Sequence, residues 1–325
     1  MKTVPRIRFA HLPTPVEELP RLSALLGGPR VLVKRDDCTG LAFGGNKTRK
    51  LEFLLAEARE KRARTLITAG AAQSNHCRQT AAAAAREGFS CVLVLNGKKP
   101  ETLSANLLLD TLFGARIVWV EDRADRERMQ LETFAALEAA GEAPYFVPYG
   151  GSSPTGALGY AFAVEEMLSQ GVDADCMVFG TSSGGTHAGL VLGARVFGYR
   201  GRVLGISIDE SESWLKTRVS SLASEASTLL GDRIDFSPDE ILANDGYCGA
   251  GYGVLTAAER EAVGLFARHE GLVLDPVYTG RAAAGLIDLI RSGEFGPDKT
   301  LLFWNTGGQP ALFAEKYQSH ILVGE

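Results

Sequence analysis

The sequence lacks the features that mark several broad classes of protein. Its 325 residues include only five scattered cysteines without a C-x-x-C pair, and no histidine or cysteine cluster has the spacing of metal ligands. This composition argues against a disulfide scaffold or a structural metal and favours reduced thiols. No run of about 18 apolar residues could span a bilayer, and the N-terminal segment has no apolar core of signal-peptide type. We therefore expect a cytoplasmic protein without a metal.

An excess of charge of one sign is also missing. The formal net charge is -5, and no basic stripe or block of Lys and Arg occurs along the sequence. This pattern argues against nucleic acid or a membrane surface as a partner. Hydrophobic residues make up 45% and charged residues 22%, which is typical of a globular enzyme with a small-molecule substrate.

What the sequence does have is an alternation of strand-like and helix-like segments. Apolar runs predict strands at 31–34, 65–70, 91–95, 115–121, 144–148, 176–180 and 202–208, and strands that end in loop turns within 272–280 and 300–308. Helical spacing predicts helices at 51–58, 74–87, 103–115, 123–140, 157–169, within 182–198, in the first half of 211–245, and at 256–271 and 281–293. This alternation predicts an α/β fold with a largely parallel sheet and helices on both faces.

Residues 43–50, FGGNKTRK, place three cations where a helix begins. The helix dipole disfavours Lys47, Arg49 and Lys50 in this position by a few tenths to about 1 kcal/mol each. A helix start that collects cations is suited to an anion, and phosphate is the usual one. The alternative is that these are solvated surface charges. A nucleotide-binding loop, G-x-x-x-x-G-K-[ST], fits less well because one extra residue precedes Lys47.

Polar loops follow several predicted strands. The segment 180–187, GTSSGGTH, offers hydroxyls and free N–H groups at a helix start, which suits phosphate; the alternative is a tightly packed turn. The segment 69–76, AGAAQSNH, offers Ser74, Asn75 and His76 to a carboxylate, or else a helix cap and a buried histidine. Because ligands lie at the carboxyl ends of strands, these loops are expected to share one pocket.

Lys47 is the candidate nucleophile. A lysine must be neutral to attack a carbonyl, and we expect Arg49, Lys50 and the helix dipole to lower its pKa. Tyr278, in DPVYTG, is either a packed ring or an acid–base group. One reactive lysine, a separate phosphate site and no metal site together indicate the Schiff-base cofactor pyridoxal phosphate.

Several motifs resemble those of a known family. KRDDCTGLAFGGNKTRKLEFL, TAGAAQSNHCRQTAAAAA, SSGGTHAGL, GYGV, LDPVYTG and NTGGQPALF stand in the order seen in the D-cysteine desulfhydrase / 1-aminocyclopropane-1-carboxylate deaminase family. These are fold-type II pyridoxal-phosphate enzymes related to the tryptophan synthase β subunit, and the resemblance covers about residues 8–315. It implies two open, mainly parallel twisted sheets with flanking helices, and a homodimer. It also implies a large cofactor-binding domain of residues 1–50 and 160–325 and a small domain of residues 51–159.

The resemblance also assigns roles to matching residues. Lys47 would bond the aldehyde of the cofactor and move the proton at the substrate's α carbon, with Tyr278 and Ser74 as the other catalytic candidates. The cofactor would be held by Lys47, Lys50, Asn75, Ser183, Gly184, Gly185, Thr186, Thr279 and Thr306. The substrate would be held by Ser74, Asn75, His76, Tyr252 and Tyr278.

Three positions resemble the desulfhydrase branch of the family. Thr279 stands where the deaminase has Glu, His76 where it has Gln, and Thr306 where it has Leu. A hydroxyl near the ring nitrogen is sufficient for β-elimination, whereas a carboxylate makes the ring a stronger electron sink and suits the opening of a cyclopropane.

Other positions depart from the family pattern. Asn305 replaces the usual His before TGG, Arg281 replaces the usual Lys after YTG, and Gln309 and Cys248 are also unusual. L-cysteate sulfo-lyases resemble this chain too, but they usually carry Gln where this chain has His187. That difference argues against a sulfonate leaving group.

The sequence therefore predicts a pyridoxal-phosphate lyase that performs β-elimination on a small amino acid. D-cysteine is the expected substrate, with pyruvate, sulfide and ammonia as products. The alternatives within the fold are 1-aminocyclopropane-1-carboxylate deaminase and L-cysteate sulfo-lyase. The alternatives from other classes are a non-catalytic binding protein and a P-loop-like nucleotide hydrolase.

Overall fold

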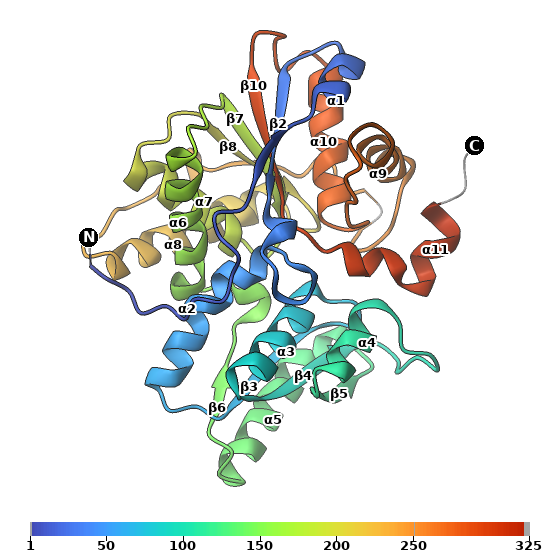
Figure 1. Cartoon of the computed structure of the whole chain (residues 1–325). Helices are drawn as coiled ribbons and strands as arrows, with labels where there is room; N and C mark the ends of the chain where they lie inside the picture. Colours follow the sequence, from blue (N-terminus) through green and yellow to red (C-terminus); the bar gives the residue numbers. More distant parts are fainter. Residues whose placement is uncertain (1, 250, 322–325) are drawn as a thin grey trace.

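The protein, represented by a computed structural model that describes residues 2–249 and 251–321, contains two open β-sheets (Figure 1). The larger sheet has the order β1-β2-β10-β7-β8-β9. Its strands are β1 (Val16–Glu18), β2 (Arg30–Arg35), β10 (Thr300–Asn305), β7 (Cys176–Thr181), β8 (Arg202–Ser207) and β9 (Leu242–Asn244). All neighbours in this sheet are parallel except β1 and β2, which are antiparallel.

The smaller sheet lies below the larger one in the view of Figure 1. Its order is β5-β4-β3-β6, and every pair of neighbours is parallel. The strands are β5 (Arg116–Val120), β4 (Ser90–Asn96), β3 (Thr65–Ala71) and β6 (Pro144–Phe146). The prediction of two mainly parallel sheets is confirmed.

Helices cover both sheets. They are α1 (Pro20–Leu26), α2 (Asn46–Glu60), α3 (Asn75–Glu87), α4 (Ala105–Leu112), α5 (Arg126–Ala139), α6 (Pro154–Ser169), α7 (Gly185–Phe197), α8 (Glu212–Leu229), α9 (Ala257–Glu270), α10 (Thr279–Arg291) and α11 (Glu315–Ile321). Serine caps fix several helix starts, because the hydroxyls of Ser74, Ser153 and Ser211 accept hydrogen bonds from backbone N–H groups in the first turns of α3, α6 and α8.

Strand β10 shows that the larger sheet is buried on both faces. Leu301 and Phe303 pack in a cluster with side chains of α1, α9 and α10, whereas Leu302 and Trp304 pack with α6 and α7. Successive side chains of a strand point to opposite faces. The continuous apolar run TLLFW therefore fits a parallel strand covered by helices on each side.

The strand predicted at the start of 272–280, before the loop turn, is wrong. Residues 271–275 form no ladder, and the chain turns at once into α10. Leu272 and Leu274 are buried in the core, which explains the strand-like pattern, but the Asp275 carboxylate accepts the N–H groups of the following turn. Burial without a neighbouring strand produced the misleading periodicity.

The division into two domains stays a prediction. The smaller sheet is built from residues 65–146, within the predicted small domain, but the boundaries after residues 50 and 159 fall inside α2 and α6. Each of these helices therefore continues from one predicted domain into the other.

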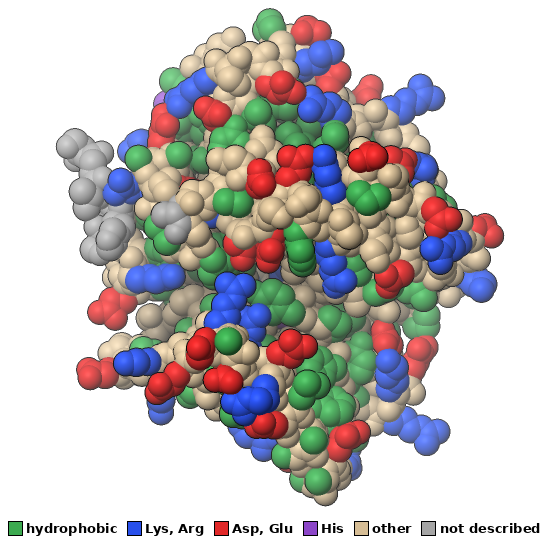
Figure 2. Space-filling model, turned by 180° about the vertical axis from the view of Figure 1, so that it is seen from behind, with side chains coloured by type: hydrophobic (Ala, Val, Ile, Leu, Met, Phe, Trp, Pro, Cys, Tyr) green, Lys and Arg blue, Asp and Glu red, His purple; other side chains and the backbone are tan. Residues whose placement is uncertain are grey.

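Three further features of the described residues concern surface charge, membrane spans and metal ligands. On the face seen in Figure 2, acidic and basic side chains are interspersed. Among residues 2–249 and 251–321, no helix is both long enough and apolar enough to cross a bilayer. In the same residues, no group of three or more His, Cys, Asp or Glu side chains is placed to hold a metal ion.

Candidate active site

A cavity lies where the carboxyl ends of strands from both sheets meet. It encloses about 630 Å³ of space free of atoms, part of it open to solvent. Its lining consists of Asn46, Lys47, Ser74, Asn75, His76, Tyr149, Gly150, Gly180, Thr181, Ser182, Ser183, Gly184, Thr186, Tyr278, Thr306 and Gly307. Helices α2, α3 and α7 all begin at this cavity. Their N-termini give it a positive potential that favours anions.

Lys47 lies in the first turn of α2 with its amine buried. Its backbone N–H donates to Gln79 Oε1 at 3.1 Å, which fixes the start of the helix. Burial lowers the pKa of Lys47 to about 8, and hydrogen bonding with Lys50 opposes this shift. The neutral form of the Lys47 amine is therefore accessible, as predicted. The predicted cause was wrong, because burial lowers this pKa and the neighbouring charges do not.

Lys50 lies one turn further along α2. Its Nζ donates to the Gly150 carbonyl at 3.1 Å, and burial and the charge of Lys47 hold the pKa of Lys50 well below its ordinary value. Among the ion pairs of the described residues, none joins a carboxylate to Lys47 or Lys50. Two buried amines without an acidic partner fit an anionic ligand such as a phosphate.

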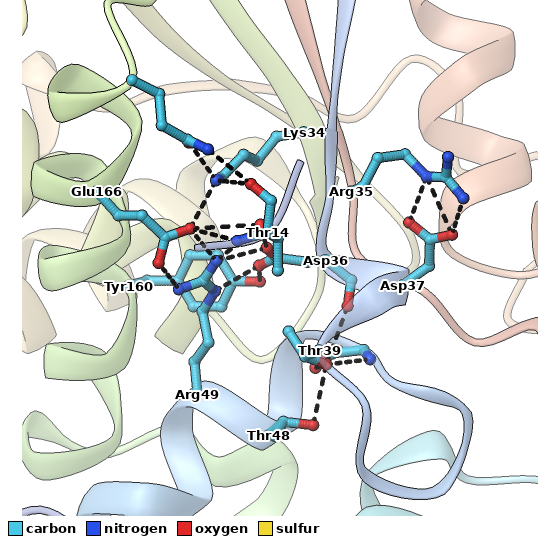
Figure 3. Close-up of polar contacts among 12 residues, drawn as sticks. Thr14, Lys34, Arg35, Asp36, Asp37, Thr39, Thr48, Arg49, Tyr160 and Glu166 are labelled. Carbon is cyan, nitrogen blue, oxygen red and sulfur yellow. Dashed lines mark hydrogen bonds and ion pairs between the residues drawn. The ribbon is translucent and has the colours of Figure 1, made fainter. Parts of the chain in front are cut away.

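Arg49, the third predicted cation, does not reach the cavity. Its guanidinium turns to the other side of α2 and joins a buried cluster of charged side chains (Figure 3). It donates to Asp36 and Glu166 at 2.8 to 2.9 Å, and Lys34 donates to Glu166 at 2.6 Å. The prediction that Arg49 lowers the pKa of Lys47 is wrong because these carboxylates neutralise its charge.

The glycine-rich turn before α7 has the predicted form of an anion site. Gly184 is the N-cap, with a left-handed φ of +81°, and no side chain caps the helix there. Ser183 Oγ lies 2.8 Å from Ser152 Oγ, and the N–H of Gly185 donates to Ser152 Oγ at 3.1 Å. Thr186 Oγ1 accepts from Asn46 Nδ2 at 3.1 Å, which ties this turn to α2.

The start of α3 presents the predicted polar cluster. Ser74 Oγ accepts from the Cys77 N–H at 3.2 Å and so acts as a helix cap. Asn75 Oδ1 accepts from Asn106 Nδ2 at 2.8 Å and from Arg78. Since its carbonyl oxygen is occupied, Asn75 has its amide N–H groups available at the cavity.

His76 is held in a neutral state. Its Nε2 lies 2.9 Å from Thr68 Oγ1, and the Thr68 hydroxyl donates to the Val147 carbonyl at 2.8 Å. The Thr68 oxygen must then accept, so Nε2 of His76 carries the proton. Burial and the charges of Lys47 and Lys50 keep the pKa of His76 well below its ordinary value.

Two tyrosines, Tyr252 and Tyr278, meet beside the cavity. The hydroxyls of Tyr252 and Tyr278 lie 2.8 Å apart, with the rings at 73° to one another. Burial raises the pKa of both phenols, so each keeps its proton near neutral pH. Tyr278 lines the cavity, and Tyr252 lies behind it.

The two predicted threonines differ in position. Thr306 lines the cavity, and its carbonyl accepts the N–H of Asn46 at 2.9 Å. Thr279 is buried, donates from Oγ1 to Asp275 Oδ1 at 2.8 Å, and accepts the Asp275 N–H at 2.7 Å. Because its proton is already donated to Asp275, the Thr279 hydroxyl can only accept a hydrogen bond from any further group in this arrangement.

The unusual residues lie around the cavity and do not line it. Asn305 Oδ1 accepts the Gly307 N–H at 3.1 Å, which shapes the turn after β10, and Arg281 forms a buried ion pair with Glu259. His187 is buried with its ring edge-on to Phe179 and is not among the residues that line the cavity. The argument from His187 against a sulfonate leaving group therefore has no contact to support it. Gln309 and Cys248 are also absent from the lining.

Sequence reasoning missed Tyr149, Ser152 and Asp275. Tyr149 lines the cavity with the Arg126 guanidinium 4.6 Å from its ring centre. Tyr149 and Ser152 belong to YGGSSP, a further strand–loop–helix turn between β6 and α6 whose Gly-Gly and Ser-Ser pairs were a usable signal. Asp275 stands inside the DPVYTG motif, of which the sequence indicated only Tyr278 and Thr279 as site residues.

Comparisons with known proteins agree with this geometry. A family described as "Pyridoxal-phosphate dependent enzyme" matches residues 7–307. The D-cysteine desulfhydrases of Salmonella choleraesuis and Salmonella typhimurium are 44% identical to this chain, covering 98% of it and 97% of their own length. A crystal structure described as an ACC deaminase homologue has a TM-score of 0.90 at 38% identity, covering 98% of this chain and 96% of its own. A threonine deaminase from Solanum lycopersicum shares the fold, with a TM-score of 0.66 at 16% identity over 91% of this chain and 79% of its own.

Proposed function

The chain belongs to the family of pyridoxal-phosphate dependent enzymes, and we propose that it converts D-cysteine and water to pyruvate, hydrogen sulfide and ammonia. The observation that carries this proposal is the cavity itself. A buried lysine amine with a pKa of about 8, an anion-binding helix start and a hydrogen-bonded tyrosine pair all lie at one cavity, in a chain 44% identical to D-cysteine desulfhydrases.

The residues around the cavity fit the cofactor. Lys47 would bond its aldehyde carbon, while Lys50 and the 183–186 turn would hold its phosphate. Asn75, with its amide N–H groups available, would donate to the ring oxygen, and Thr279 and Thr306 would lie at the ring nitrogen. The absence of an acidic partner for the two buried amines, within the described ion pairs, supports this fit. When bound, pyridoxal phosphate supplies an electron sink for negative charge at the substrate's α carbon.

The start of α3 is suited to the substrate carboxylate. Ser74, Asn75 and His76 lie at a helix N-terminus, where partial positive charge favours an anion. The Nε2–H group of His76 donates to the Thr68 hydroxyl oxygen, so the His76 ring is held in one orientation. A carboxylate bound here would direct the α carbon toward Lys47 on the neighbouring helix.

Lys47 and Tyr278 would act on different atoms of the substrate. The Lys47 amine is the stronger candidate for accepting the α proton, because burial lowers its pKa to about 8 and makes the neutral form accessible near neutral pH. Tyr278 has a raised pKa and keeps its proton, so its hydroxyl would donate a hydrogen bond to the sulfur, which departs as hydrosulfide and takes a proton from water. The eliminated 2-aminoacrylate would then react with water to give pyruvate and ammonia.

Deamination of 1-aminocyclopropane-1-carboxylate is the second candidate. It is favoured by the TM-score of 0.90 to the ACC deaminase homologue. The hydroxyl of Thr279, where a carboxylate would suit ring opening, favours β-elimination.

One assay panel tests the proposal. The purified protein should show the visible absorption of bound pyridoxal phosphate, and Lys47→Ala should remove it. D-cysteine, L-cysteine, L-cysteate and 1-aminocyclopropane-1-carboxylate are then scored for sulfide, sulfite and keto acid. Pyruvate and sulfide from D-cysteine at the highest kcat/KM support the proposal. Faster release of 2-oxobutanoate from the cyclopropane substrate, or normal turnover by Lys47→Ala, would contradict it.

We also propose that the protein forms a homodimer. Three large apolar side chains are solvent-exposed in the single chain: Phe43 at 65%, Leu112 at 71% and Phe313 at 61%. Phe43 is also held at a positive φ of 68°, a strained conformation that is more readily explained by a partner than by the isolated chain. Light scattering after size exclusion should give twice the mass of the chain, and a monomer mass would refute the dimer.

A further inference from the structure

Arg281 occupies a position where a cation is disfavoured by its own helix. It lies in the first turn of α10, yet its side chain is only 1% exposed. Nε donates to Glu259 Oε1 at 2.7 Å, and the other guanidinium N–H groups donate to backbone carbonyls. These carbonyls belong to Ile208, just after β8, and to Gly251 and Val254 at 3.3 and 3.1 Å. The arginine therefore joins α10 to three other segments.

The two loop carbonyls lie on either side of Tyr252. Gly251 and Gly253 have φ values of +107° and +71°, so the backbone of residues 251–254 has wide conformational freedom and is costly to order. The Tyr317 hydroxyl, from α11, donates to the Gly253 carbonyl at 2.9 Å. Figure 1 shows α9, α10 and α11 on the same side of the molecule, around this loop. Arg281 and Tyr317 together hold three carbonyls of this short segment.

We infer that Arg281 is a positioning residue: by binding the carbonyls of Gly251 and Val254 it fixes Tyr252 against Tyr278. The Tyr252 hydroxyl lies 2.8 Å from the Tyr278 hydroxyl, and Tyr278 lines the cavity. Each hydroxyl has one proton, and one of the two protons forms the hydrogen bond between the tyrosines. When the pair is held in place, the other proton is directed to a ligand. The effect on catalysis rests on the proposed function, whereas the effect on the loop does not.

The shape of the arginine side chain matters for this role. A guanidinium presents five donors in a planar fork, which here reach a carboxylate and three carbonyls in different directions. A lysine would keep the charge but has one ammonium group, which cannot lie beside Glu259 and both loop carbonyls at once. Arg281→Lys is therefore the informative substitution: it introduces the residue that is usual here in the family, but against the contacts of this chain the charge stays and the fork is lost.

Hydrogen–deuterium exchange of the holoenzyme tests the effect on the loop. Amides of residues 251–256 should exchange about tenfold or more faster in Arg281→Lys than in the wild type. Arg291→Lys is the matched control, because Arg291 lies on the same helix, is about half exposed, and pairs with Glu261 on the surface. Unchanged exchange in Arg281→Lys would overturn the inference. If that variant does not fold, Arg281→Met with Glu259→Gln removes both buried charges together and takes its place.

A double-mutant cycle tests the link to Tyr252. We expect Arg281→Lys and Tyr252→Phe each to lower kcat/KM for D-cysteine by about 10- to 100-fold. The combined variant should be no slower than the slower single variant, because both changes disturb the same tyrosine pair. Effects that multiply would overturn the role of Arg281 in positioning Tyr252. If no amino acid is turned over, the proposed function fails. The exchange experiment still tests the loop contact in that case, because faster exchange in Arg281→Lys does not depend on any activity.

Discussion

Arg49 and Asp36 form a buried two-bond ion pair behind the cavity. Arg49 Nε donates to Asp36 Oδ2 and Nη2 donates to Asp36 Oδ1, both at 2.8 Å (Figure 3). Both side chains are almost fully buried, and Tyr160 donates a further hydrogen bond to Asp36. Burial alone would raise the pKa of Asp36, but the charge and hydrogen bonds of Arg49 outweigh burial and hold this pKa below its ordinary value. Since Arg49 is two residues from Lys47, the pair fixes the part of α2 that carries the reactive amine.

We expect Arg49→Met to destabilise the protein by about 3 to 5 kcal/mol, because it leaves Asp36 buried without its cation. Urea unfolding monitored by circular dichroism measures this loss. Arg59→Met is the control: Arg59 lies on the same helix but is half exposed and pairs with Glu87, so a loss of about 1 kcal/mol or less is expected. Equal losses in the two variants would show that the buried pair does not anchor α2.

The pKa of Lys47 predicts a pH dependence for cofactor binding. Burial lowers this pKa to about 8, and only the neutral amine attacks an aldehyde. The rate at which apoprotein regains the visible absorption of pyridoxal phosphate should therefore rise about tenfold per pH unit below pH 8 and level off above it. The folded pKa is lower than the unfolded value of 10.5, so the apoprotein should also become more stable as pH rises from about 8 toward 10.5. A rate that still climbs tenfold per unit above pH 9 would mean an unperturbed lysine.

The orientation of Asn75 predicts an effect of a residue outside the cavity. Asn106 Nδ2 donates to Asn75 Oδ1 at 2.8 Å and so keeps the Asn75 amide N–H groups available at the cavity. Asn106→Ala should weaken pyridoxal phosphate binding about tenfold, the effect of about 1.4 kcal/mol expected for one lost hydrogen bond. Thr111→Ala, on the same helix with its hydroxyl bonded to the Leu107 carbonyl of that helix, should bind normally. Cofactor titration followed by fluorescence measures both, and equal affinity of Asn106→Ala and the wild type would contradict this role.

Much of the site could be predicted because each part follows a strand and starts a helix. Lys47, Ser74 and Ser183 stand at such turns, and parallel strands bring their carboxyl ends to one edge. The meeting of two separate sheets at one cavity came from the resemblance, since periodicity does not say which strands share a sheet.

What the sequence could not show depends on side-chain directions. Arg49 and Lys50 are adjacent, yet one pairs with Asp36 and the other faces the Gly150 carbonyl, because neighbouring positions on a helix point to different sides. Likewise, the apolar alternation at 272–275 reports burial alone, and no local signal distinguished it from a strand. Sequence patterns locate a turn, but tertiary packing decides which of its side chains reach the ligand.

The position of His187 leads to a prediction about the leaving group. Its ring is fully buried against Phe179, burial lowers the pKa of His187 to about 3, and it does not line the cavity. His187→Gln should therefore leave the ratio of kcat/KM for D-cysteine over L-cysteate within about twofold of the wild type. The same change should destabilise the fold by about 1 to 3 kcal/mol, because it buries an amide, with one oxygen and two N–H groups to satisfy, in place of the ring. His76→Gln, at a residue that lines the cavity, is the matched comparison and should change the ratio about tenfold or more. A similar change in His187→Gln would mean that discrimination between sulfide and sulfite as leaving groups acts through α7, behind the 183–186 turn.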